Sequence, residues 1–357
     1  MGLVDPPAHD EIEVTVFGRG VGECVVVHVG NNKWVIIDSY ICEHKLQDPR
    51  SRRMRRAPIA HWYLDRMNIQ PERIGQIVVT HFHRDHYNGV DLLHDHYLKA
   101  QLLVTAALDP EVFRQVYADR VTPGLCGKLP ETMAQAKRRV SDGGASGLRT
   151  LGVGSYMQID KTRLTALSPM DPAVNASADA IALRMTTGRR DVRKFLRDLN
   201  WCSVAMHLHS DAGYALLGAD LVNAPPQYGW QAVLAEPNHQ SLDAASMVKV
   251  PHHGSPNADH IPMWQRLVED RPQMAVAPYT SSRPTRPSLE DCRRLCDRGA
   301  LYQAALSIEL VTDEFGYDSA AEGPTGIVQA RRRPGESQWR IATEGAAFHV
   351  NPVLAID

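Results

Sequence analysis

Residues 80–89, with the sequence Thr-His-Phe-His-Arg-Asp-His-Tyr-Asn-Gly, restrict the possible folds of this chain more than any other segment. Three imidazoles and one carboxylate fall within six residues, directly after the apolar run 77–79. A strand that ends in such a cluster brings nitrogen donors and a hard oxygen donor to one point, which is the ligand chemistry of a metal site. The chain has 16 His, so a single His-x-His pair would mean little, but the complete His-x-His-x-Asp-His pattern is much rarer.

The spacing inside this motif predicts two neighbouring metal ions. Side chains alternate along an extended segment, so His81 and His83 are expected on one side. Asp85 and His86 come after the strand end, where the chain can turn them towards a second ion. The motif alone therefore predicts a strand, a metal-binding loop and a site for two cations.

The motif resembles the signature of the metallo-β-lactamase superfamily. Three further segments are similar to conserved elements of that superfamily, in the same order and spacing: the opening hairpin at residues 25–38, the strand that ends in the bridging aspartate at 215–220, and the strand that ends in the last histidine at 248–255. The four segments together cover residues 13 to about 290. The resemblance implies an α/β fold, the four-layer αββα sandwich of that superfamily.

Within the superfamily, two segments are most similar to the hydrolase domain of the DNA-uptake competence channel (ComEC-like) proteins and their soluble relatives. These segments are the His-His-Gly-Ser sequence at 252–255 and residues 200–203. Those relatives lack the usual third-motif histidine, and here too no Gly-His-Thr sequence precedes the strand expected at 203–206. Asn200 or Ser203 occupies this neighbourhood, so the filling of the first metal position stays open.

Length and motif placement favour one domain over residues 1–357. An apolar content of 43% and a charged content of 22% are ordinary for a soluble globular protein. Because the motifs are scattered from Asp38 to His253, we expect a single domain with a helical insertion around 107–200 and a C-terminal β extension around 305–357.

The charge balance and the termini give further expectations. A net charge of −2 produces no global field that would attract nucleic acid or membrane. The chain starts without a basic segment and an apolar segment of the kind that forms a secretory signal, and no apolar run approaches the length of a membrane span. The six Cys show no metal-ligand spacing. We therefore expect a cytoplasmic protein without a membrane anchor.

Two local arginine clusters could still contact phosphate groups. Five arginines lie in residues 50–56, where a solvated surface and a phosphate-binding patch are equally compatible with the sequence. Arginines and a lysine recur at residues 189–197 with a spacing that places several on one helix face, and here a solvated face is the simpler interpretation.

The resemblance implies a ligand for each metal position. His81 and His83 would bind one ion, Asp85, His86 and His253 the other, and Asp220 would bridge both. A water shared by two such ions has its pKa lowered toward about 7, which yields a metal-bridged hydroxide as the nucleophile. The ligand types accept zinc or manganese, and we expect two divalent ions of one of these metals.

The same resemblance suggests roles for the residues around the ions. Asp85 would take part in catalysis, and His252 would contact substrate or protonate a leaving group, because His253 is the better match to the ligand position. Asp38 would orient a ligand histidine and raise its basicity, or else close a turn. The residues expected to bind substrate are Asn200, Ser255 and Arg286. Arginine could hold a phosphate but could not act as a neutral base.

Three functions are compatible with this pattern. The first is a phosphodiesterase or nuclease whose partner is a nucleic acid or nucleotide, and the second is a hydrolase of a small ester, lactone or lactam. The third is a metal-binding, non-enzymatic component with protein partners in a defence or signalling system. The competence-like segments and the arginine clusters favour the first.

Overall fold

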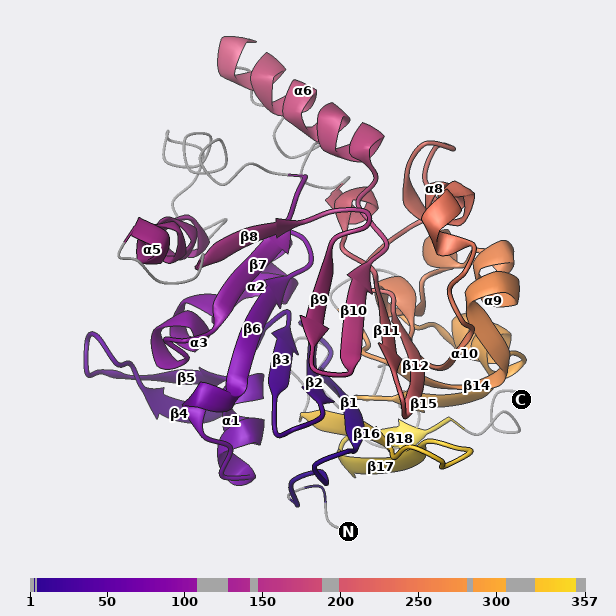
Figure 1. The fold of residues 1–357 in the computed structure, drawn as a ribbon, viewed down its shortest axis with the longest axis horizontal. Helices are drawn as coiled ribbons and strands as arrows, with labels where there is room; N and C mark the ends of the chain where they lie inside the picture. Colours follow the sequence, from indigo (N-terminus) through magenta and orange to yellow (C-terminus); the bar gives the residue numbers. More distant parts are fainter. Residues whose placement is uncertain are drawn as a thin grey trace.

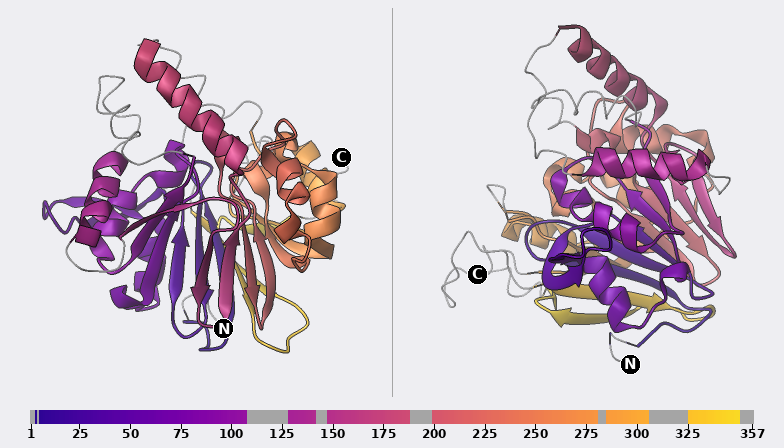
Figure 2. Two further views of the ribbon diagram at one scale, coloured as in Figure 1. Left: turned by 45° about the horizontal axis from the view of Figure 1, so that its top comes forward. Right: turned by 90° about the vertical axis from the view of Figure 1, so that its left-hand side faces the viewer.

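The computed structural model describes residue 3 and residues 5–107, 128–141, 147–187, 199–280, 285–305 and 325–350. In this part of the chain two eight-stranded sheets pack face to face. Helices cover the outer face of each sheet, as Figure 1 shows from one side and Figure 2 from two others. The αββα sandwich expected from the sequence is therefore confirmed.

The first sheet combines the N-terminal strands with two strands from the far end of the chain. Its order is β17 (Arg340–Gly345), β16 (Gly326–Arg332), β1 (Ile12–Gly18), β2 (Cys24–Val29), β3 (Trp34–Ile37), β6 (Ile74–Val79), β7 (Gln101–Thr105) and β8 (Leu148–Leu151). The strands from β17 to β3 pair antiparallel, and those from β3 to β8 pair parallel. Runs of valine and isoleucine, which favour extended backbone, form the centre of this sheet, in β2, β3 and the end of β6.

The second sheet contains the strands that carry the later motifs. Its order is β18 (Phe348–His349), β15 (Ala300–Gln303), β14 (Val268–Val276), β13 (Ala245–Lys249), β12 (Gly213–Leu217), β11 (Met206–Ser210), β10 (Thr162–Ala166) and β9 (Tyr156–Ile159). The strand expected to end in Asp220 is confirmed as β12, which forms a hairpin with β11. Strands β12, β13, β14 and β15 are parallel.

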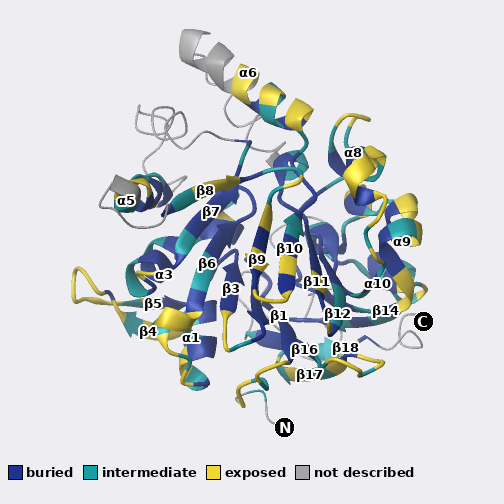
Figure 3. Cartoon of the chain, viewed as in Figure 1, coloured by how far each residue is buried: buried dark blue, intermediate teal, exposed yellow. Residues whose placement is uncertain are grey.

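Three apolar clusters fill the spaces between the four layers. One lies between the sheets, where valines of β1 and β2 meet residues such as Leu208 and Met247. The outer clusters hold the helices: α1 (Ile59–Arg66), α3 (Val90–His96) and α5 (Leu129–Ser141) on the first sheet, and α8 (Gly229–Ala235), α9 (Ile261–Leu267) and α10 (Leu289–Cys296) on the second. Figure 3 shows the resulting buried sheets and exposed outer helix faces.

The segment predicted as a helical insertion is only partly helical. Within 107–200 the structure describes α5 and α6 (Asp171–Thr187), but also β8, β9 and β10, which are integral to the two sheets. In the predicted C-terminal β extension, β16 and β17 add an edge to the first sheet. No helix of the described residues has the length and hydropathy needed to cross a bilayer.

Of the two arginine clusters, the structure describes only the one at residues 50–56. Residues 50–56 belong to a hairpin of β4 (Ile41–Gln47) and β5 (Met54–Pro58), in which Arg50 pairs with Asp95 and Arg55 with Asp48 and Asp91. Carboxylates thus already neutralise part of this cluster. The cluster at residues 189–197 lies outside the described residues.

The carboxyl ends of four strands meet at one end of the sandwich. Strands β3 and β6 run parallel in the first sheet, as β12 and β13 do in the second. A hydrogen bond from the Val204 amide to the Thr80 carbonyl, 3.0 Å long, joins the sheets there. The loops that follow these strands carry the predicted ligands, so the fold brings them to one place.

Candidate metal centre

His86 is held by Asp38. His86 lies in α2 (Arg84–Tyr87), shortly after β6, and is completely buried. Its Nδ1 atom is 2.7 Å from Asp38 Oδ2. A carboxylate only accepts hydrogen bonds, so Nδ1 carries a proton, and Nε2 is the ring nitrogen left to bind a cation. The Nε2 atom lies 3.3 Å from Asp220 Oδ2 and 3.6 Å from Asp85 Oδ2, so it faces two carboxylates.

Asp38 also orients a second histidine, through Thr80. The Thr80 amide donates to Asp38 Oδ1 at 2.7 Å, and its hydroxyl donates to Oδ2 at 2.6 Å. The same hydroxyl oxygen lies 3.1 Å from His81 Nδ1 and can accept its proton, as can the Ser203 hydroxyl, also at 3.1 Å. One buried carboxylate thereby fixes the rings of both His81 and His86, and it leaves the Nε2 atom of each for a ligand.

His253 presents its Nε2 atom from the second sheet. Its Nδ1 donates to the Ala277 carbonyl at 2.9 Å, and Nε2 lies 3.5 Å from Asp220 Oδ2 and 3.8 Å from Asp85 Oδ2. His252 and His253 both have left-handed backbone, with φ of 44° and 54°, which non-glycine residues rarely adopt. The tight turn that results sends the two adjacent imidazoles to different places.

His83 lies against His81. The His83 Nδ1 and His81 Nε2 atoms are 3.0 Å apart, and His81 Nε2 is 3.8 Å from Asp220 Oδ2. Since the Nδ1 proton of His81 is accounted for by Thr80 and Ser203, its Nε2 lone pair faces the His83 nitrogen. Two imidazole nitrogens in this arrangement suit a shared cation.

The donor set fits divalent cations. Three buried atoms of the cluster have no hydrogen-bond partner among the described residues: His86 Nε2, Asp220 Oδ1 and Glu23 Oε2. Buried polar atoms without partners are rare. Two overlapping groups, His81 with His86 and Asp220, and Asp85 with His86 and His253, each have ligand atoms within 4.8 Å of one another. Imidazole nitrogens and carboxylate oxygens gathered at such separations match the ligand chemistry of zinc or manganese.

The electrostatics of the cluster are those of a site that needs positive charge. Burial alone would lower the pKa of His86, but Asp220, Asp85 and Asp38 raise it well above its ordinary value. Burial would likewise raise the pKa of Asp220, yet His253 and His86 hold it well below its usual range. Protons on these imidazoles thus offset the carboxylates when no cation is bound, and a cation would displace them.

The structure brings all six predicted ligands together and separates His252 from them. The residues that converge are His81, His83, Asp85, His86, Asp220 and His253. The His252 ring instead lies between two amides, with Nε2 2.9 Å from Asn200 Nδ2 and Nδ1 2.8 Å from Asn257 Oδ1. Of the adjacent pair, His253 is the one placed as a ligand, and the roles of these residues remain predictions.

Of the three residues predicted to bind substrate, Asn200 and Ser255 lie beside the centre, and the Arg286 side chain is already paired with a carboxylate. Asn200 contacts His252, and the Ser255 amide donates to the His252 carbonyl at 2.9 Å. The Arg286 guanidinium is paired with Asp291 at 2.6 Å. The Arg286 backbone forms a bridge with Tyr279, and the Tyr279 ring stacks on His253 with centroids 5.1 Å apart.

The sequence interpretation missed Glu23 and Lys249. Both are buried, and Glu23 Oε1 lies 2.5 Å from Lys249 Nζ directly beside the predicted ligands. Glu23 follows the Gly-x-Gly-x-Gly string at residues 18–22, which reads as a turn and gives no sign of a ligand. Lys249 did carry a signal, because a lysine inside the apolar run 247–250 needs a buried partner.

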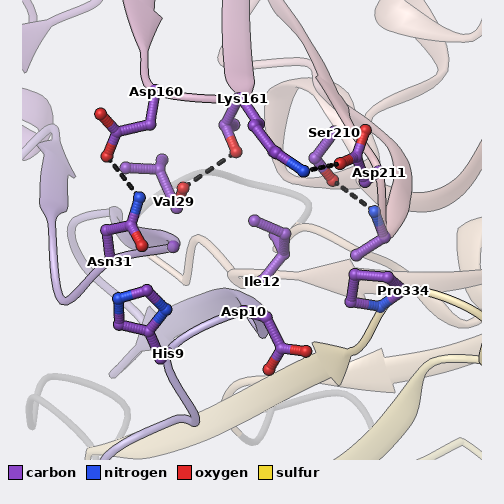
Figure 4. A pocket seen from close by; sticks show the side chains of 13 residues that line it. His9, Asp10, Ile12, Val29, Asn31, Asp160, Lys161, Ser210, Asp211 and Pro334 are labelled. Atoms are coloured by element: carbon purple, nitrogen blue, oxygen red, sulfur yellow. Dashed lines mark hydrogen bonds and ion pairs between the residues drawn. The ribbon is translucent and has the colours of Figure 1, made fainter.

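A cavity at the opposite end of the sandwich contains none of the predicted ligands. It has a volume of 260 Å³ and lies between the start of β1, the end of β2, and the turns that join β9 to β10 and β11 to β12. Figure 4 shows the Asn31–Asp160 and Lys161–Asp211 contacts at its rim. This cavity is therefore separate from the candidate metal centre.

Comparison with known proteins supports the fold. Residues 17–111 match the family model described as the Metallo-beta-lactamase superfamily. No curated protein matches the chain.

Solved structures with a similar fold share little sequence with the chain. One is MEM-A1, a subclass B3 metallo-beta-lactamase from a soil metagenome library, with 13% identity, 71% of this chain and 83% of that chain covered, and a TM-score of 0.39. Another is the metallo-beta-lactamase fold protein YhfI from Bacillus subtilis, with 11% identity, 67% and 70% covered, and a TM-score of 0.34. A third is an E377D mutant of the CmlA beta-hydroxylase, with 13% identity, 76% and 46% covered, and a TM-score of 0.37.

Because these TM-scores lie below 0.5, no activity of these proteins is assigned to this chain. The finer likeness to competence-channel hydrolases has no counterpart among these three proteins and stays a prediction. The match over residues 17–111 and the αββα layering together identify this chain as a protein of the metallo-β-lactamase fold.

Proposed function

We propose that this chain is a metal-dependent hydrolase that cleaves phosphodiester bonds in a nucleic acid or nucleotide. The observation that carries the hydrolase proposal is the convergence of buried imidazoles and carboxylates in which His86 Nε2 and Asp220 Oδ1 have no hydrogen-bond partner among the described residues. Such a set is unfavourable unless cations fill it. Inert cores rarely contain it, whereas metal-dependent hydrolases require it.

The chain's own residues would hold the ions in two overlapping groups. His81 and His83 face one position, and Asp85, His86 and His253 face the other, with Asp220 between them. Divalent cations held there would acidify water and stabilise negative charge on a reacting phosphate. The Asp85 side chain is 21% exposed, while those of His86 and Asp220 are buried. Asp85 is therefore the carboxylate placed to meet substrate.

Asn200 and His252 form the polar wall next to this group. Since the Asn257 side-chain oxygen accepts from His252 Nδ1 and the Asn200 amide group donates to Nε2, His252 is neutral and has no proton on Nε2. Burial further lowers the pKa of His252, so it remains neutral. In this state His252 cannot protonate a leaving group as expected from the sequence. Asn200 Oδ1 is buried without a partner among the described residues and offers an acceptor to substrate.

Arginines beside the His252–Ser255 turn support an anionic substrate. The Arg294 guanidinium donates to the Gly254 carbonyl at 2.7 Å, directly behind the ligand turn. Arg286 and Arg298 lie on either side of it, and the three guanidinium groups share the two carboxylates Asp259 and Asp291. Three guanidinium groups thus share two carboxylates beside the ligand turn, and guanidinium groups bind phosphate more readily than a neutral lactam.

The test is a hydrolysis assay with the full chain and added Mn²⁺, Mg²⁺ or Zn²⁺. We expect cleavage of bis(p-nitrophenyl) phosphate or of DNA or RNA with at least one metal, and no cleavage by the Asp85→Ala variant. Asp211→Ala, which removes a surface carboxylate paired with Lys161, is the control that should retain activity. Absence of cleavage with all three metals would refute the phosphodiesterase proposal, and turnover of a chromogenic cephalosporin instead would favour a lactam hydrolase.

A further inference from the structure

Glu23 has an unsatisfied oxygen in the wall of the metal centre. It lies between β1 and β2, directly after Gly22, where φ is 90° and any Cβ atom would lie 2.5 Å from Tyr40 Cβ, so only glycine fits. The Glu23 amide donates to the Asp85 carbonyl at 3.0 Å, which fixes Glu23 to the loop that carries the ligands. Its Oε2 atom is buried and has no hydrogen-bond partner among the described residues.

Lys249 accounts for only one of the two carboxylate oxygens. Lys249 Nζ lies 2.5 Å from Glu23 Oε1 and donates to the Ala219 carbonyl at 2.9 Å, next to Asp220. The lysine thus ties Glu23 to the chain segment that carries Asp220. One carboxylate oxygen of Glu23 also lies within 4.8 Å of ligand atoms of Asp220 and His253.

A purely structural ion pair would look different, and this chain provides an example. Glu13 and Arg331 form another buried pair, with Arg331 Nε 2.7 Å from Glu13 Oε2. There the second oxygen, Oε1, accepts hydrogen bonds of 2.7 Å from both Thr15 and Tyr63. Burying an ion pair is unfavourable unless the remaining lone pairs are satisfied. The Glu13 pair meets this condition within the protein, and the Glu23 pair does not.

Glu23 is not explained as a hydrogen-bond partner of His253. The distance from Glu23 Oε2 to His253 Nδ1 is 3.7 Å, which is too long for a hydrogen bond, and Nδ1 already donates to the Ala277 carbonyl. Glu23 instead belongs to two groups whose ligand atoms lie within 4.8 Å of one another, one with Asp220 and His253 and one with Asp38 and His86.

We propose that Glu23, held by Lys249, is a further carboxylate of the metal centre and serves the position faced by Asp85, His86 and His253. This inference rests on the proposed metal-dependent function. With Asp220, the position then has three carboxylates against two imidazoles. Carboxylate oxygen favours hard cations, so this position prefers Mn²⁺ to a greater degree than its histidines alone would allow.

The test is calorimetric titration of the metal-free full chain with Mn²⁺ and, separately, Zn²⁺. The main variant is Glu23→Gln with Lys249→Met, which removes the pair without leaving an unpaired buried charge. We expect one of the two Mn²⁺ binding steps to weaken at least tenfold, with a smaller change for Zn²⁺ and no change in the other step. The matched control is Glu13→Gln with Arg331→Met, which removes a similar buried pair and should leave both binding steps unchanged.

A conservative variant keeps the test valid if the double variant does not fold. Glu23→Asp retains the charge beside Lys249 but withdraws the carboxylate by one methylene, and it should also weaken one Mn²⁺ step. Wild-type Mn²⁺ affinity in the double variant, or in Glu23→Asp where the double variant is unfolded, would overturn the inference. A wild-type chain that binds metal but cleaves no phosphodiester would refute only the proposed function, whereas a chain that binds no metal would refute both.

Discussion

Replacing Asp38 with asparagine should disable two histidines at once. The side chain keeps its size, so Oδ1 can still accept from the Thr80 amide. The new NH₂ group, however, faces the His86 Nδ1 proton, and the Thr80 hydroxyl loses the oxygen to which it donates. His86 can avoid this clash by keeping its proton on Nε2 instead of Nδ1, which takes away the nitrogen that would bind the cation. The change therefore alters a tautomer rather than deleting a ligand.

The expected magnitude follows from the role of such outer hydrogen bonds. Loss of a partner that orients a ligand histidine weakens metal binding about 10–100-fold, which corresponds to about 1.4–2.7 kcal/mol. Because the Thr80 hydroxyl also contacts His81 Nδ1, we expect a loss towards the upper end of this range. Both metal positions should be weakened, unlike in the Glu23 variants.

Competition of the metal-free protein with a chromogenic zinc chelator measures this change. Asp160→Asn is the control, because it makes the same chemical change at an exposed carboxylate that contacts Asn31 and Lys33 far from the centre. Circular dichroism should show that both variants are folded. If Asp38→Asn bound zinc as tightly as the wild type, the proposed orientation of His81 and His86 by Asp38 would be wrong.

Two further predictions concern stability. Arg331→Met should lower the free energy of unfolding by about 3–5 kcal/mol in urea denaturation, because it leaves the buried Glu13 carboxylate without its cation. Adding Glu13→Gln should restore most of the lost stability. Equal stability of the single and double variants would contradict this prediction. The second prediction concerns His94, which is buried and whose two ring nitrogens have no hydrogen-bond partner among the described residues. Burial lowers the pKa of His94 to about 4, and the nearby Arg139 and Arg50 contribute to this shift. The native state therefore stays neutral while the unfolded state takes up a proton, so stability is lost as the pH falls from about 6.5 to about 4. His94→Leu should raise the free energy of unfolding by about 1–2 kcal/mol at pH 7.5 and by about 2 kcal/mol more at pH 5; a gain that is independent of pH would show that His94 does not titrate in this way.

The parts of the fold that the sequence predicted are those with local signals. The hairpin of β11 and β12 has strand-forming residues on both sides of a short polar turn, and the ligand motif directly follows the apolar end of β6. The segment 107–200 was harder, because short strands such as β8, with four residues, are defined by their neighbours in the sheet rather than by their own pattern.

The residues of the candidate site likewise fall into those that the sequence could predict and those that it could not. His81, His83, Asp85 and His86 could be found because their spacing in sequence carries the chemistry. Glu23 could not, since its partner Lys249 lies on another sheet and its orphan oxygen exists only in the folded structure. The neutral state of His252 likewise depends on two asparagines that only folding brings to its ring.

The pairing of β1 with β16 has a consequence for biosynthesis. The strand that precedes Glu23 has β2 on one side, but its other side stays open until β16 arrives, and the Glu13–Arg331 contact joins residues 318 positions apart. A growing polypeptide therefore exposes an unpaired, apolar strand edge until residues 326–332 have been synthesised. Co-expressed chaperones that shield this edge, or expression at reduced temperature, would be expected to improve the yield of folded protein.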